Sequence, residues 1–178
     1  MQSNDPAMVI ECLNGYRIKE KAPNNIGEFR VPLGKVETTK QGNDITLVTY
    51  GSTWRVVMDA AEKLEVAGIS SEVIDIQTLV PLDLSHDIAE SIKKTNRLLV
   101  IDEDVPGGAS AYILQQIIEG QDAYNFLDSE PQTLSAKEHR PPYGKDGDYF
   151  TKPSVEDIFE KVYFIMHEVN PEKFPSLY

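Results

Sequence analysis

The sequence predicts an α/β fold, a three-layer α/β/α sandwich with a mostly parallel sheet. Short apolar runs rich in β-branched residues, such as Leu98–Ile101, are typical of strands buried on both faces. Stretches with apolar residues at helical spacing follow these runs, so strands and helices alternate. Right-handed crossovers then place helices over both faces of the sheet. The 178 residues suffice for one well-cored domain with an additional arm.

Residues 1–30 are expected to lie outside that domain. Ala7–Cys12 predicts a short strand, but polar, turn-rich residues flank it, and a lone strand is not stable by itself. We therefore expect 1–30 to hold the last strand of a missing preceding domain and a linker, with the domain itself at 31–178. Cys12 lies in an apolar run and is expected to be a buried, inert thiol.

Two strand–helix units open the domain. Ile45–Tyr50 predicts the first strand, and Trp54–Ala67 the helix that follows it. Gly68 suits the end of this helix. The second unit comprises a strand at Glu72–Ile76 and a short helix near His86–Lys93.

A third unit begins with Leu98–Ile101, which is expected to be a central parallel strand. Ser110 is expected to cap the next helix, whose apolar stripe consists of Ile113, Leu114, Ile117 and Ile118. Gln132–Ala136 predicts a fourth, weaker strand at an edge of the sheet. Ser154 is expected to cap the last helix, and Asn170–Tyr178 to run irregularly over the surface.

The most site-like stretch follows the central strand, where ligands or partner domains meet an open α/β sheet. It consists of acids and turn glycines: Asp102, Glu103, Asp104, Gly107 and Gly108. One interpretation is a crevice or an interface. The other is a solvated strand end with a turn, in which Gly107 or Gly108 adopts positive φ. Both interpretations stay open.

The loop Lys137–Pro153 is the second candidate interface. It contains His139, Arg140 and Tyr143 among prolines and further aromatic residues, and interfaces are enriched in Arg and aromatic residues. Partner contact and a plain surface loop are weighed equally here, ahead of a general acid–base role for His139. Gly51–Thr53 could hold an anion at a helix start, but we favour a helix cap.

Composition and missing motifs exclude several functions. The chain has no GxGxxG, P-loop, GxSxG or HExxH motif, and its single cysteine excludes a disulfide within the chain. Its three histidines show no metal-ligand spacing, and His167 is expected to be a surface residue at a helix end. The net charge of −12 argues against nucleic-acid and anionic-membrane surfaces. Without an apolar run near 18 residues or a signal segment, a cytoplasmic protein is expected.

Taken together, five segments of the chain resemble one family. That family is the transketolase C-terminal-like domain of the β subunit of 2-oxo acid dehydrogenase first components, with the branched-chain (2-oxoisovalerate) type as the nearer match. The "PLGK" entry and the "EVID-x-QT-x-x-P-x-D" segment are its most specific motifs. The resemblance is carried by Asp5–Glu11, Val31–Glu37, Ile45–Ser52, Glu72–Asp83 and Lys94–Glu103.

The resemblance implies a non-catalytic assembly domain of an enzyme that decarboxylates a 2-oxo acid oxidatively. Thiamine diphosphate and magnesium would serve the full-length enzyme, held by the missing pyrimidine-binding domain and the α partner, and none is expected to bind this chain alone. The implied partners are an α subunit or α portion, a second β subunit in a homo-oligomer, and the acyltransferase component. Gln77, where many relatives have Arg, and the loop Glu138–Tyr143 depart from the family pattern.

Two alternatives remain. One is the equivalent domain of a transketolase or a deoxyxylulose-phosphate synthase. The other is a stand-alone α/β module that binds a small ligand.

Overall fold

The computed structural model describes residues 4–144 and 146–178, without the side chain of Asn14. The chain divides into two units at the Arg30–Val31 junction, and each is described by itself.

The first unit contains a short 3-10 helix, η1 (Leu13–Arg17), and no strand among its described residues. Ala7–Cys12 forms no strand here, since no second strand of the unit is present to pair with it. That it completes the sheet of a preceding domain stays a prediction. Cys12 is only half-buried, so the expected buried thiol is also not found.

The second unit is built on a five-stranded sheet in the order β1-β3-β2-β4-β5. Its members are β1 (Glu37–Lys40), β2 (Ile45–Thr49), β3 (Ser71–Asp75), β4 (Leu98–Ile101) and β5 (Gln132–Leu134). Neighbours among β2 to β5 pair in parallel, whereas β1 pairs antiparallel with β3. The mostly parallel sheet, the interior position of β4 and the edge position of β5 are thus confirmed. β1 was not predicted, because a short polar edge strand lacks apolar alternation.

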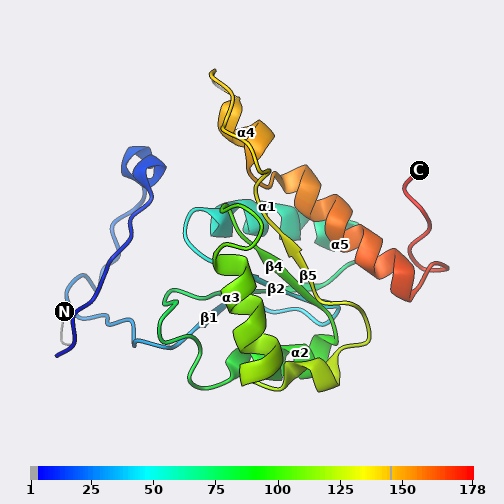
Figure 1. The fold of residues 1–178 in the computed structure, drawn as a ribbon, viewed down its shortest axis with the longest axis horizontal. Helices are drawn as coiled ribbons and strands as arrows, with labels where there is room; N and C mark the ends of the chain where they lie inside the picture. The colour runs from blue at the N-terminus through cyan, green and yellow to red at the C-terminus, as the bar shows by residue number, and fades with distance from the viewer. Residues whose placement is uncertain (1–3, 145) are drawn as a thin grey trace. The chain divides into compact units, whose positions relative to one another are not determined.

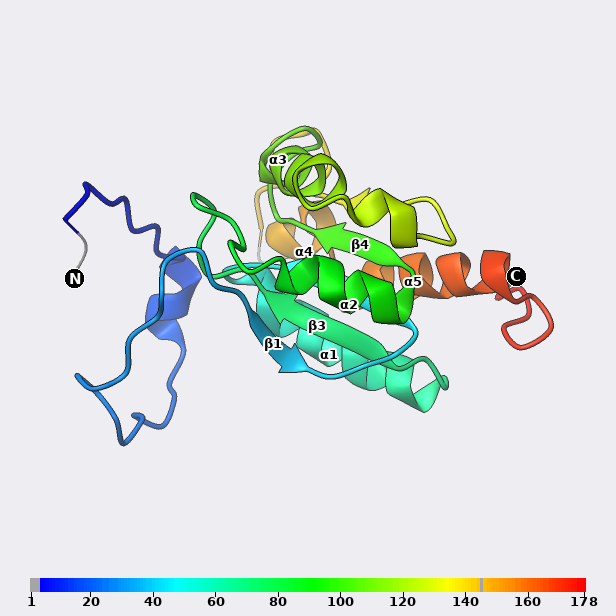
Figure 2. The ribbon, with the colours of Figure 1, turned by 90° about the horizontal axis from the view of Figure 1, so that it is seen from below.

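Helices cover both faces of this sheet. The α-helices are α1 (Thr53–Val66), α2 (Asp87–Thr95), α3 (Ala109–Gln115), α4 (Gly147–Thr151) and α5 (Val155–Val169). A π-helical turn, η2 (Gln116–Gly120), continues α3, and a 3-10 turn, η3 (Ala123–Phe126), follows it. Figure 1 shows α1 and α5 above the sheet and α2 below it, and Figure 2 shows the same layers from below. The three-layer architecture is confirmed.

Alternation along the strands creates two cores, one on each face. On β2, Ile45 and Leu47 pack in the core with α1 and α5, whereas Val48 packs in the core with α2 and α3. Thr46 is fully buried, but its hydroxyl is hydrogen-bonded to Ser91 and Thr95, at 2.7 Å each. A polar group is therefore tolerated in this core because it has partners.

The ends of α5 connect it to the rest of the domain. Ser154 Oγ accepts the Asp157 N–H at 3.1 Å, and the Asp157 carboxylate accepts the Ser154 N–H at 2.9 Å, so the expected cap is a complete capping box. Beyond α5 the tail is irregular, as expected, but Phe174 is buried in the α1–α5 core. His167, expected to be a surface residue, instead forms a 2.6 Å hydrogen bond through Nδ1 to the carbonyl of Phe174.

Candidate functional site

The candidate site lies at the carboxyl edge of the sheet, where β2 and β4 end side by side. β2 has β3 on one side and β4 on the other, so this is the topological switch point at which open α/β sheets bind ligands. Val48 pairs with Val100 in the register, so Tyr50 and Asp102, each two residues further along, come to neighbouring positions.

Asp102 is the buried centre of this edge. It is 0% exposed, and its Oδ1 accepts the Tyr50 hydroxyl at 2.7 Å and the Asp104 N–H at 3.1 Å. Its Oδ2 accepts the Ser110 N–H at 3.0 Å. These three hydrogen bonds offset the cost of burying the carboxylate. They also connect the end of β2, the turn and α3.

The expectation that Ser110 caps α3 is therefore wrong. The helix begins at Ala109 after Gly108, which has no side chain to cap it, and Asp102 from the preceding strand accepts an N–H of the first turn instead. Burial, and then the hydrogen bond with Asp102, raise the pKa of Tyr50 well above its usual range. Tyr50 consequently remains a protonated donor well into the alkaline range.

Glu103 connects two loops on the solvent side of the same edge. Its Oε2 accepts Ser52 Oγ at 2.9 Å and Lys152 Nζ at 2.9 Å. Ser52 precedes α1 but makes no side-chain cap, so the favoured cap interpretation of Gly51–Thr53 is wrong. The Glu103 carboxylate beside Ser52 also disfavours an anion at this helix start.

The two glycines of the turn are required for different reasons. Gly107 has φ of +85°, which confirms the expectation of a positive φ in this pair. Gly108 has an ordinary φ of −75°, but a Cβ there would lie 2.3 Å from Oδ2 of Asp104. Oδ1 of Asp104 in turn accepts the Val105 N–H at 2.8 Å. Asp104 therefore folds back over the turn.

The loop after β5 lies beside this turn. The Ala136 N–H donates to the Asp104 carbonyl at 2.9 Å, and Lys152 pairs with Glu103 at the far end of the loop. α4, which was not predicted, forms within the loop and is only five residues long. The structure thus brings the loop and the turn, both singled out in the sequence, to one edge of the sheet.

Within this loop, two cations lie over aromatic rings. The Arg140 guanidinium is 4.7 Å from the ring centre of Tyr143, and Lys137 Nζ is 4.1 Å from that of Phe150. The His139 ring also lies 5.6 Å from the Phe150 ring. His139 Nδ1 is hydrogen-bonded to the Arg140 carbonyl at 3.0 Å. Tyr143 is 86% exposed, and Tyr149 and Phe150 are also exposed. Exposed aromatic and guanidinium groups are the side chains that dominate protein interfaces.

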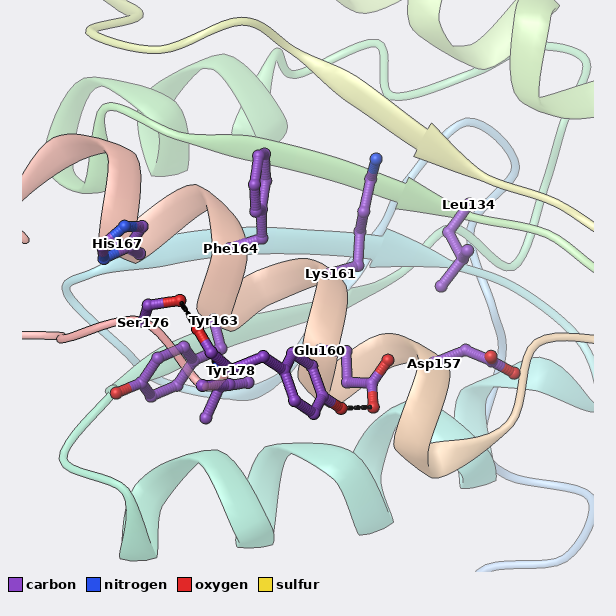
Figure 3. Close-up of a pocket in the computed structure, with 10 residues that line it drawn as sticks. Leu134, Asp157, Glu160, Lys161, Tyr163, Phe164, His167, Ser176 and Tyr178 are labelled. Carbon is purple, nitrogen blue, oxygen red and sulfur yellow. Dashed lines mark hydrogen bonds between the residues drawn. The ribbon is translucent and has the colours of Figure 1, made fainter.

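A pocket of about 370 Å³ lies elsewhere, between α5, β5 and the tail. Figure 3 shows Tyr178 alongside α5, and its hydroxyl donates to Glu160 at 2.8 Å. Leu134 and Phe164 also line the pocket. Sequence reasoning missed it because its walls come from three segments with no common motif. Among the described residues, no group of three His, Cys, Asp or Glu side chains could hold a metal ion, and no helix is long and apolar enough to cross a membrane.

Comparison with known sequences matches residues 34–158 to the family described as transketolase, C-terminal domain. The "Pyruvate dehydrogenase E1 component subunit beta" of Mesostigma viride is 32% identical over 91% of this chain and 48% of its own length. The subunit of the same name from Staphylococcus epidermidis is 38% identical over 67% of this chain and 36% of its own length. The chain thus spans about half or less of the curated relatives it matches.

Among solved structures, the chain resembles that titled "Split gene transketolase, inactive beta4 tetramer". The TM-score is 0.61 at 19% identity, over 81% of this chain and 46% of that one. A second similar structure is a 2-oxoglutarate:ferredoxin oxidoreductase from Magnetococcus marinus, with a TM-score of 0.50 at 20% identity, over 80% of this chain and 21% of that one. At these identities the likeness shows a common fold.

Proposed function

The chain belongs to the transketolase C-terminal domain family, and on that premise we propose that it is the assembly domain of a 2-oxo acid dehydrogenase first component. In this proposal it forms the C-terminal part of a β subunit or β portion and is not itself catalytic. The observation that carries the proposal is the 32% identity to a pyruvate dehydrogenase E1 β subunit over 91% of the chain. The chemistry would come from an α partner and from a preceding domain, which residues 1–30 would connect to this one.

The carboxyl edge does not fit a magnesium diphosphate. Such a group needs oxygen ligands that are free to coordinate the ion. Asp102 is instead engaged by three donors and Glu103 by two. We therefore assign thiamine diphosphate and magnesium to the absent parts of the enzyme, and no step of the reaction to this chain.

The 2-oxo acid is proposed to be pyruvate or 2-oxoisovalerate. The curated relatives named above are called pyruvate dehydrogenase subunits, which makes pyruvate the first substrate to test. The branched-chain acid remains the second, on the sequence motifs. The compartment that we propose is the cytoplasm, which suits a chain with a single cysteine and hence no disulfide within the chain.

The proposed partners are an α subunit or α portion, a second β subunit and the acyltransferase component. The exposed aromatic and cationic side chains of the loop, with Arg140 and Tyr143 at their centre, support a contact with a partner at the carboxyl edge. Exposed apolar area also favours self-association. Sedimentation at high protein concentration and moderate salt should show dimers, and a strictly monomeric chain would count against this part of the proposal.

Calorimetric titration of the pure chain with thiamine diphosphate and magnesium tests the assignment of the cofactor. No saturable heat is expected, because the local carboxylates are already hydrogen-bonded within the fold. Saturable binding in the micromolar range would overturn the proposal of a non-catalytic assembly domain and would favour a ligand-binding module.

A further inference from the structure

Three adjoining hollows run along the outer side of the α1–α5 layer. The first is the 370 Å³ pocket, the second measures about 250 Å³ and the third about 480 Å³. Glu160 lines both the first and the second, and Lys63 lines both the second and the third. Together they form one trough, named here the α1–α5 trough.

Apolar side chains occur along the whole trough. Val66, at the end of α1, is 91% exposed, and Phe164, on the outer face of α5, is 52% exposed. Phe159 lies between them in the second hollow. Apolar side chains exposed on two packed helices suit a further helix, which can lie in the groove that the pair forms.

The rim of the trough is acidic. Five carboxylates and two lysines line the three hollows, and the carboxylates are Asp59, Glu62, Glu156, Asp157 and Glu160. The α-helices of the other layer are less acidic. α1 and α5 together carry seven acids and three bases, whereas α2 has two acids and two bases and α3 has no charged residue.

We propose that the α1–α5 trough binds a basic amphipathic helix of a partner protein. The apolar side of that helix would cover Val66, Phe159 and Phe164. Its Lys or Arg side chains would pair with Asp59 and Glu62 of the rim, since Glu156, Asp157 and Glu160 already bond with Lys63, Ser154 and Tyr178. A second copy of this chain fits less well, because a two-fold contact would place two acidic rims against each other. The proposal concerns a face other than the carboxyl edge and does not rest on the proposed function.

A synthetic helix with leucine on one face and lysine on the other serves as the probe, with fluorescence anisotropy as the measurement. The Asp59→Lys/Glu62→Lys variant should weaken binding about tenfold, because it reverses charge on the rim. The matched control is Glu119→Lys/Glu130→Lys, which makes the same change of charge at exposed residues outside the trough and should leave binding within about twofold.

The apolar contact has its own pair of variants. Val66→Ser should weaken binding of the probe, whereas Tyr124→Ser, at an exposed side chain on the opposite layer, should not. Val66 is so exposed that its replacement should leave the fold intact. A leucine–glutamate helix of the same pattern should not bind the unmodified chain.

Three results would overturn the proposal. The first is no binding of the lysine helix at millimolar concentration. The second is equal weakening by both charge-reversal variants, which would show attraction to the net charge alone. The third is loss of self-association in Val66→Ser, which would show that a second copy covers the trough.

Discussion

At the scale of single residues, the carboxyl edge depends on a buried carboxylate and two glycines. Asp102 is satisfied by donors from β2, the turn and α3, so it holds three segments together at one point. Gly107 supplies a positive φ, and Gly108 leaves space for the Asp104 carboxylate. Most of the acids and glycines singled out in the sequence therefore have a specific task in the fold.

Replacing either glycine should destabilise the domain, but for separable reasons. Gly107→Val and Gly108→Val should each cost on the order of 1–3 kcal/mol, through backbone strain at the first and a clash at the second. Thermal and urea unfolding measure both costs. In an Asp104→Ala background the cost of Gly108→Ala should fall, because the carboxylate that its Cβ meets is gone, while the cost of Gly107→Ala should stay the same. If both valine variants melt at the same temperature as the unmodified chain, this turn does not require glycine at either position.

Tyr50 makes the free energy of unfolding depend on pH in the alkaline range. Its pKa is raised in the folded state, chiefly by burial, whereas an unfolded tyrosine titrates near 10. The unfolded chain therefore loses this proton first, and the free energy of unfolding falls as pH rises above about 10. Urea unfolding between about pH 8 and 11 should show a smaller fall for Tyr50→Phe than for the unmodified chain. Equal falls would mean that this hydroxyl is not held protonated by the fold.

At the scale of elements, the strands with two buried faces and the long amphipathic helices could be predicted from sequence. β2 and β4 are rich in apolar residues because helices cover both their faces, and β3 contributes the buried pair Val73 and Ile74. β1 and α4 could not, because a polar edge strand and a five-residue helix are fixed by contacts with distant segments. The turn after β4 could be predicted from its acids and glycines. Its contact with Tyr50 could not, because that contact depends on the register of β2 and β4.

Caps show where local pattern succeeds and where it fails. Ser154 caps α5 through a local box of four residues, Ser154 to Asp157, whereas Ser52 and Ser110 were expected to cap helices and do not. Their sequence surroundings do not reveal that Glu103 takes the Ser52 hydroxyl or that Asp102 takes the Ser110 N–H. Glu103 follows a different strand from the one before Ser52, and Asp102 lies eight residues before Ser110, farther than a local capping box reaches.

Two serine variants test this difference. Ser154→Ala should lower the free energy of unfolding by about 1 kcal/mol, because the Asp157 N–H loses its acceptor. Ser52→Ala should cost less, since its hydroxyl makes a partly exposed hydrogen bond to Glu103 and no cap. Denaturant titration of both variants gives the comparison, and equal costs would contradict the assignment of caps.

The tail is an element of the core although its backbone is irregular. Phe174 is 3% exposed and packs edge-on against Tyr163, with ring centres 6.0 Å apart. Phe174→Ala should destabilise the domain by about 3–5 kcal/mol, since it removes a buried ring and leaves a cavity. Leu177→Ala, at an exposed position of the same tail, is the matched control and should change the melting temperature little. A small effect of Phe174→Ala would show that the tail is not part of the core.

At the scale of the whole molecule, charge and exposed apolar surface are unevenly distributed. Residues 1–30 contain four acids and four bases, so the entire net charge of −12 resides on residues 31–178. Four of these twelve negative charges lie on α1 and α5, which together carry seven acids and three bases, while exposed aromatic residues gather in the loop after β5. Both surfaces suit protein contacts, and the carboxyl edge, where enzymes of this architecture bind ligands, is occupied by the domain's own side chains.

The central claim is that this chain contributes assembly and not chemistry to a 2-oxo acid dehydrogenase. The most direct measurement is a dye-reduction assay on pyruvate and 2-oxoisovalerate, with thiamine diphosphate and magnesium present throughout. The account predicts no turnover by the chain alone, and turnover that appears only when a preceding β-subunit domain and an α subunit are added to it. Turnover by the pure chain, or a mixture whose activity is the same with and without the chain, would contradict the account.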